Sequence, residues 1–163
     1  MRPTPTVAKP GQESVWEYPR PPRLEPSNKR IEVLFRGHVI AETHNSIRVL
    51  ETSLAPSYYI PPDDIHLEFL TQADRTTWCE WKGKAQYFSI EAENNTAANA
   101  AWAYFSPTSP YESIRGYFSF YPSRAECSLD GEVVKSQPGG FYGGWVTSDI
   151  IGPFKGERGT ENW

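Results

Sequence analysis

The fold class of this chain is limited most strongly by one sequence feature. Short runs of β-branched and aromatic residues are separated by turn residues. The runs begin at Arg30 and are punctuated by Gly, Pro and Asn along most of the remaining chain. No stretch has the apolar spacing of a long amphipathic helix, and no repeat of fixed period is present. The pattern therefore predicts an all-β (mainly β) fold, with two packed or strongly bent antiparallel sheets and short helical turns.

Apolar alternation and turn residues assign the individual strands. The expected strands are residues 31–35, 39–43, 47–52, 65–70, 84–93, 100–105, 116–121 and 127–134. Arg36-Gly37-His38 is expected to close the first hairpin, and Asp130-Gly131 has the composition of a two-residue hairpin turn. Short helical turns are expected at residues 61–64 and 109–114.

The chain divides into three expected parts. Residues 1–30 contain much of the proline and predict an extended arm, with apolar residues such as Trp16 to anchor it. Residues 31–135 form the expected β domain with an aromatic pocket. Residues 136–163 are rich in glycine and aromatic residues, which predicts a C-terminal tail packed on that domain.

Charge and hydropathy exclude several classes of function. A net charge of -4 at pH 7 argues against a protein that binds nucleic acid through a basic face. No run reaches the roughly 18 apolar residues of a membrane span, and the first ten residues lack a signal-peptide core. We therefore expect a soluble cytoplasmic protein with no membrane partner, in which Cys79 and Cys127 are reduced thiols.

Metal and nucleotide motifs are not found in the sequence. The histidines, none of which has zinc-site spacing, are His38, His44 and His66. Glu91 and Glu93 would share one strand face and could hold Mg²⁺, although the Asn94-Asn95 turn beside them favours exposure to solvent. Phosphate-loop, dinucleotide-fold and nucleophile-elbow motifs are missing, so we expect no metal and no cofactor.

The aromatic residues, 14% of the chain, suggest a ligand pocket. Trp102 and Tyr104 would lie on one strand face, where they could clamp a planar guest or simply form core. Lys82 could favour the thiolate of Cys79, and the simpler interpretation is a buried thiol beside a surface lysine. No catalytic residue can be assigned. The predicted ligand-binding residues are Tyr58, Cys79, Lys82, Trp102, Tyr104 and Tyr121.

Four motifs in order resemble the domain-of-unknown-function family numbered four-two-seven. They are residues 50–61, 79–87, 99–104 and 116–121, within a similarity that spans about Val33 to Glu126. The resemblance implies a small, mainly β fold, and the arm and tail look like those of longer members. The family's name implies a nucleotidyltransferase-like activity, but the chain has no Gly-Ser turn to accompany the closely spaced carboxylates Glu91 and Glu93.

A binding protein for a small ligand is the leading functional hypothesis from the sequence. One alternative is a nucleotidyltransferase-like enzyme acting on a nucleotide or other phosphate-containing substrate. Another is a structural or interaction protein that uses the proline-rich arm and the tail as contacts. The sequence leaves both a monomer and a homodimer open.

Overall fold

The computed structural model describes residues 2–163 and is mainly β, which confirms the predicted fold class. The strands are β1 (Glu13–Ser14), β2 (Arg23–Ser27), β3 (Ile31–Phe35), β4 (His38–Thr43), β5 (Ser46–Leu50), β6 (Ser57–Tyr59), β7 (Leu70–Cys79), β8 (Gly83–Ala92), β9 (Asn95–Ala103), β10 (Phe118–Phe120), β11 (Glu126–Leu129), β12 (Glu132–Val133), β13 (Lys135–Ser136), β14 (Trp145–Val146) and β15 (Ile150–Ile151). The 3-10 helices are η1 (Val15–Glu17), η2 (Pro62–Asp64), η3 (Leu67–Phe69) and η4 (Ser109–Ile114). None of the helices within residues 2–163 has the length and apolar character needed to cross a membrane.

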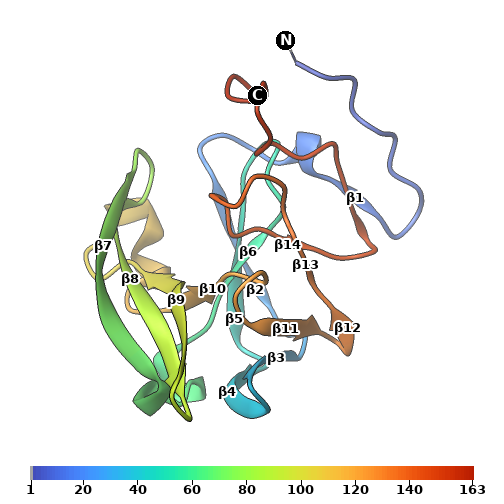
Figure 1. Cartoon of the computed structure of the whole chain (residues 1–163). Helices are drawn as coiled ribbons and strands as arrows, with labels where there is room; N and C mark the ends of the chain where they lie inside the picture. The colour runs from blue at the N-terminus through green and yellow to red at the C-terminus, as the bar shows by residue number, and fades with distance from the viewer. Residues whose placement is uncertain (1) are drawn as a thin grey trace.

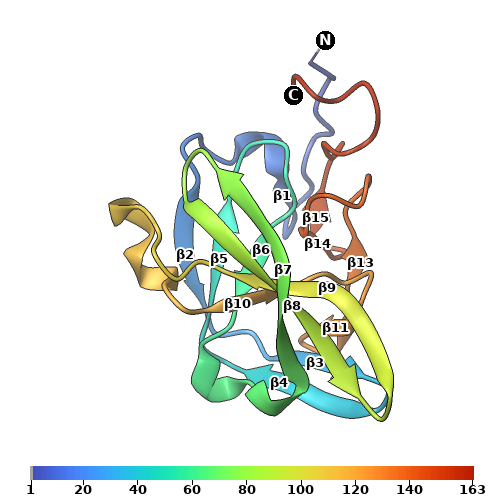
Figure 2. The same ribbon diagram turned by 60° about the vertical axis from the view of Figure 1, so that its left-hand side comes forward.

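The strands form several sheets rather than only two. Two sheets have four strands, in the orders β10-β9-β8-β7 and β12-β11-β3-β4, and a third has the order β2-β5-β6. Two short pairs, β1-β15 and β13-β14, complete the set, and only β1-β15 is parallel. Figures 1 and 2 show the long strands β7 to β9 facing the β2-β5-β6 sheet.

Turn residues close the hairpins where the sequence predicted them. Arg36 and Gly37 join β3 to β4 with φ values of 52° and 80°, and Asp130 and Gly131 join β11 to β12 with 48° and 83°. Two consecutive positive φ values match the right-handed twist of the flanking strands. These two hairpins are confirmed, and so are the predicted helical turns, which appear as η2 and η4.

One strand prediction needs correction. Residues 65–70 do not form a strand, because Leu67–Phe69 is the helix η3 and the strand β7 begins at Leu70. β7 is an edge strand with mostly exposed polar residues, so it lacks the apolar alternation that reveals a half-buried strand. The strand expected at residues 47–52 is confirmed as β5, which pairs with β2 and β6 in a sheet separate from β3 and β4.

Strand β2 lies inside the segment that the sequence assigned to the arm. It pairs with β5 and forms the edge of its sheet. Proline has no backbone N–H to donate, and Pro26 is tolerated because an edge strand has a neighbour on one side only. Before it, Val15, Trp16 and Tyr18 are buried against Leu50 and Ile150. The arm is therefore held along the domain by both backbone pairing and apolar contacts.

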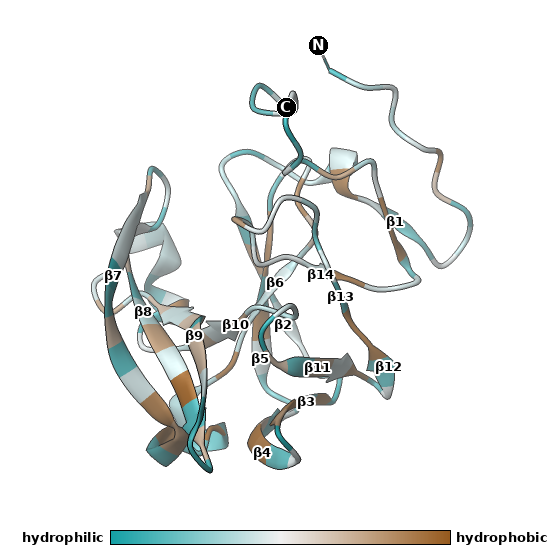
Figure 3. Cartoon of the chain, viewed as in Figure 1, coloured by the Kyte–Doolittle hydropathy of each residue, from teal (hydrophilic) through white to brown (hydrophobic). Residues whose placement is uncertain are grey.

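The alternation along the central strands divides the interior into two apolar clusters. Ala101 and Ala103 face the main core, which also holds Ile31, Phe120 and Trp145 and lies between the two four-stranded sheets. The opposite faces of β8 and β9 carry large rings into a second cluster, described below. Figure 3 shows hydrophobic and hydrophilic bands alternating along β8, as expected for a strand whose successive residues face opposite ways.

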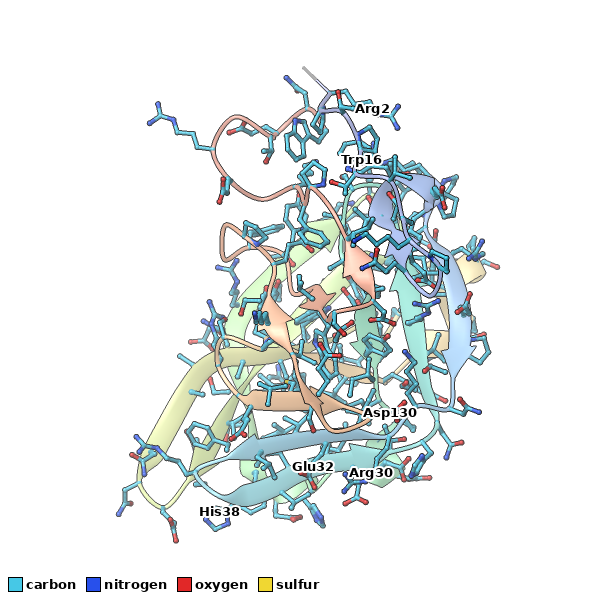
Figure 4. All side chains as sticks on the ribbon, turned by 90° about the vertical axis from the view of Figure 1, so that its right-hand side faces the viewer. Arg2, Trp16, Arg30, Glu32, His38 and Asp130 are labelled. Carbon is cyan, nitrogen blue, oxygen red and sulfur yellow. The ribbon has the colours of Figure 1, made fainter. Side chains whose placement is uncertain are left out.

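The two ends of the chain pack together. The parallel pair β1-β15 joins them, and the rings of Trp16 and Trp163 meet edge to face with centroids 5.7 Å apart. The guanidinium of Arg2 lies 4.9 Å from the centroid of the Trp16 ring. Figure 4 labels both residues near the N-terminus. Trp145 in the tail is fully buried and its Nε1 donates a 2.9 Å hydrogen bond to the Phe120 carbonyl. Residues 136–163 thus contribute directly to the core.

Candidate functional site

A cavity of about 420 Å³ lies between strands β5 and β6, strands β7 to β9 and the C-terminal tail. We call it the aromatic cavity. Its aromatic lining residues are Tyr59, Trp78, Trp81, Tyr87, Trp102, Tyr104, Tyr121, Phe141 and Tyr142. The volume falls in the range of about 300 to 1,000 Å³ that is usual for small-molecule sites.

Five of the six predicted ligand-binding residues line this cavity, namely Cys79, Lys82, Trp102, Tyr104 and Tyr121. Tyr58 does not. It faces the other side of β6, where its ring contacts Trp145 with centroids 5.0 Å apart. Because successive strand residues point to opposite faces, its neighbour Tyr59 takes the place in the cavity.

Trp102 forms the back wall of the aromatic cavity. Its side chain is only 6% exposed, and its Nε1 donates a 3.0 Å hydrogen bond to the Tyr59 hydroxyl. A Cβ at Gly143 would lie 2.1 Å from the indole ring, so the tail can pass there only with glycine. The indole is thus held between β6 and the tail.

Tyrosine hydroxyls supply polar groups to this apolar space. Tyr121 donates to the Phe141 carbonyl at 2.8 Å, and its oxygen lies 3.5 Å from the Tyr87 hydroxyl oxygen. Thr77 in turn donates to Tyr87 at 3.2 Å. Burial raises the pKa of Tyr59, Tyr104 and Tyr121 above the ordinary tyrosine value, so these hydroxyls stay protonated at neutral pH.

Two lysines bring positive charge to the cavity. Lys82 is buried, and its ammonium lies 5.7 Å from the centroid of the Tyr104 ring. The Lys155 ammonium lies at the same distance from the Tyr142 ring. Among residues 2–163, neither ammonium has a carboxylate within 4 Å or donates a hydrogen bond. Both cations therefore face the cavity without a protein anion.

Two carboxylates also line the aromatic cavity, and neither neutralises these lysines. Glu51 is 3.8 Å from the Arg20 guanidinium, which supplies its counter-charge. Glu80 follows Cys79 at the end of β7 and is exposed to solvent. The cavity thus keeps an excess of unpaired positive charge.

The sequence predicted that the tail packs on the domain, but not that tail residues line the aromatic cavity. The Gln137 side chain accepts a 2.9 Å hydrogen bond from the Ala55 amide and donates a 2.7 Å bond to the Lys155 carbonyl. It thereby fixes the tail against the loop before β6 and places Lys155 at the cavity. No sequence signal joins Gln137 or Lys155 to the β7 to β9 strands, because the link is made by side chains across the fold.

The other chemical groups noted in the sequence lie elsewhere. Glu93 is in the β8-β9 turn with a φ of 50°, so the expectation that Glu91 and Glu93 share a strand face is wrong. Glu93 instead lies 3.4 Å from His38, and Glu91 accepts a hydrogen bond from Thr71. The described residues contain no group of three or more His, Cys, Asp or Glu that could hold a metal ion.

A further, more open cavity of about 680 Å³ lies on the other side of β5. We call it the Arg48 cavity. Glu13 and Glu25 flank the guanidinium of Arg48 there, and Lys29 pairs with Asp149 at 3.3 Å. Tyr58, which the sequence assigned to the ligand site, lines this cavity instead.

Comparison with known proteins identifies a family for this chain. A comparison with curated proteins found no match. The family model described as "Domain of unknown function (DUF427)" matches residues 23–134, from β2 to just after β12. The matched region includes every strand that lines the aromatic cavity but not the tail that closes it. The match covers more than half of the chain, so this protein belongs to the DUF427 family, as the sequence motifs predicted.

Proposed function

We propose that this chain is a binding protein whose aromatic cavity holds a small molecule with a planar body and an acidic group. The observation that carries the proposal is the environment of Lys82. Its side chain is buried, with 8% of the residue exposed, yet no carboxylate of residues 2–163 lies within 4 Å of its ammonium. Lysines are rarely buried to this degree unless they are paired. The Lys82 ammonium is not itself fully buried, and the residue lines the cavity, so a ligand there can reach the charge. An acidic ligand would supply the missing partner.

The rings of the cavity support a planar body for this ligand. Tyr87, Trp102 and Tyr121 pack around one another with centroid distances between 4.7 and 6.4 Å. At the cavity edge, Trp78 is 75% exposed and Phe141 is 55% exposed. Exposed aromatic side chains next to a concave apolar surface are a common feature of binding sites.

We also propose a reducing, cytoplasmic location. Cys79 and Cys127 are both unpaired thiols, and Cys127 is buried in the main core. Free thiols are usual in compartments where glutathione and thioredoxin keep cysteine reduced. Cellular fractionation of the tagged protein in its source organism would test this location.

Matched acids and amides test the proposed ligand chemistry. We would measure binding of benzoate against benzamide and of indole-3-acetate against indole-3-acetamide by calorimetry, in the wild-type protein. The acid of each pair should bind at least about tenfold more tightly, which corresponds to about 1.4 kcal/mol. In Lys82→Gln this preference should disappear. Lys84→Gln, which changes an exposed lysine two residues further along at the start of β8, should keep it.

Equal binding of acid and amide, or a full acid preference in Lys82→Gln, would contradict the proposal. Stability gives a second readout from the same variants. Lys82→Gln should unfold at about the same urea concentration as wild type, because the Lys82 ammonium makes no ion pair or hydrogen bond within residues 2–163 that the change would break. Nucleoside triphosphates with Mg²⁺ belong in the same panel, since release of pyrophosphate would instead favour a nucleotidyltransferase-like enzyme.

A further inference from the structure

A smaller cavity of about 300 Å³ adjoins the aromatic cavity. We call it the arginine cavity. Its lining residues are Arg75, Asn99, Tyr121, Arg124, Gly139, Gly140 and Phe141. Tyr121 and Phe141 line both cavities, and the hydrogen bond from the Tyr121 hydroxyl to the Phe141 carbonyl joins the two residues. A ligand that occupies one cavity is therefore within reach of the other.

Two guanidinium groups lie against aromatic rings in the arginine cavity. Arg75 lies 4.9 Å from the Tyr87 ring centroid, and Arg124 lies 4.6 Å from the Tyr121 ring centroid. Arg124 also donates to the Asn99 carbonyl. Stacking on a ring fixes the plane of a guanidinium and leaves donors at its edge free. Within residues 2–163, neither arginine has a carboxylate within 4 Å.

The backbone supplies further donors at this place. The amides of Gly139 and Gly140 donate no hydrogen bond to any of residues 2–163. Both glycines have positive φ values, 94° and 83°. A Cβ at Gly139 would lie 1.9 Å from the Gly156 carbonyl oxygen, whereas a Cβ at Gly140 would meet nothing within 4 Å. This turn is thus packed against Gly156 on the side of Gly139 and has open space on the side of Gly140.

We propose that the arginine cavity is an oxyanion subsite, which takes a phosphate or carboxylate group of the molecule bound in the aromatic cavity. Two unpaired guanidiniums and two free amides form a set of donors that suits a group with several acceptor oxygens. The extension to one spanning ligand rests on the proposed function, but binding of an oxyanion by the subsite does not. The ligand class is then an aromatic compound with two acidic groups.

Simple anions test the subsite directly. We would titrate inorganic phosphate and, separately, acetate into the ¹⁵N-labelled protein at constant ionic strength, with chloride as the reference anion. One of the two should shift the amide signals of Gly139 and Gly140 saturably, and the stronger of them identifies the preferred oxyanion. The double variant Arg75→Gln, Arg124→Gln should weaken this binding at least about tenfold. Arg115→Gln, which removes the exposed arginine at the C-cap of η4, is the control and should bind as wild type does.

The outcomes separate the subsite from the proposed function. Unshifted glycine amides with both anions, or equal binding by the double variant, would overturn the subsite even if aromatic acids bind in the aromatic cavity. Saturable shifts in a protein that binds no aromatic acid would support the subsite and refute the proposed function. For a spanning ligand, 4-carboxyphenyl phosphate and phthalate, which each carry two acidic groups, should bind more weakly to the double variant than to wild type.

Discussion

The Arg48 cavity and the aromatic cavity lie on opposite faces of β5 and treat charge in opposite ways. Arg48, with its side chain 12% exposed, makes two 2.9 Å hydrogen bonds to Glu13 and bonds of 2.8 and 2.6 Å to Glu25. All charged residues that line the Arg48 cavity belong to ion pairs within the chain. The ion pairs of Arg48 connect β5 to β1 and β2, so we infer that the charged residues of this cavity have a structural role.

The aromatic cavity leaves its cations unpaired although it is the less open of the two. The ammonium groups of Lys82 and Lys155 lie near the rings of Tyr104 and Tyr142. The larger cavity is therefore not the better candidate for a ligand. We infer from this difference that charge pairing, more than volume, distinguishes a cavity left between packed elements from a candidate ligand cavity.

Removing Trp102 should have the largest effect, because this ring belongs to both core and cavity. The sequence left these two roles equally open. At 6% exposure, Trp102→Ala should lower the free energy of unfolding by about 3 to 5 kcal/mol. Urea denaturation measures the loss, with Trp78→Ala as the control: Trp78 lines the same cavity but is 75% exposed, so its loss should be near 0.5 kcal/mol. A loss below about 1 kcal/mol for Trp102→Ala would show that the ring is not part of the core.

Removing Arg48 tests the structural side of the comparison. Breaking a fully buried ion pair costs about 3 to 5 kcal/mol, but Glu13 and Glu25 are about 40% exposed, so we expect about 2 kcal/mol for Arg48→Ala. Arg30 is the control. It also pairs with two glutamates, Glu32 and Glu42, but 42% of its side chain is exposed. Figure 4 labels this arginine, which directly precedes β3.

Arg30→Ala should therefore destabilise the protein much less than Arg48→Ala does in the same urea experiment. The Arg48 variant should keep whatever affinity for aromatic acids the wild type has. Equal losses for the two arginines would contradict the distinction between a half-buried cross-link and a surface pair. Loss of ligand affinity in Arg48→Ala would contradict the separation of the two cavities.

A smaller effect of pH should come from Glu13. The hydrogen bonds from Arg48 hold the pKa of this carboxyl below its ordinary value of 4.5. A group with a lowered folded-state pKa stabilises the fold above its unfolded pKa and loses that contribution as pH falls through the folded value. The free energy of unfolding should therefore decrease as pH falls below about 4.5, and Glu13→Gln should show a shallower decrease. Urea denaturation at a series of pH values from 6 to 3 measures both slopes, and parallel slopes would rule out this contribution.

Local signals in the sequence were sufficient for the hairpins and for one wall of the cavity. Asp130-Gly131 fixes its turn because Asp and Gly tolerate positive φ values. Trp102 and the following Tyr104 reach the same side because side chains alternate along a strand. The failures have an equally physical cause. The polar edge strand β7 buries too little to show a pattern, and alternation alone could not say which of Tyr58 and Tyr59 faces the cavity.

The mainly β class, the family and five of the residues that line the aromatic cavity could be predicted from the sequence, because they follow from local pattern and motif. Only the tertiary structure decided which charges are neutralised. Arg48 pairs with carboxylates on β1 and β2. Lys82 has no carboxylate within 4 Å among residues 2–163, and Lys155 from the tail lines the same cavity. Ion pairing depends on distances of a few ångströms between residues far apart in the chain, and those distances are fixed by sheet packing rather than by sequence spacing.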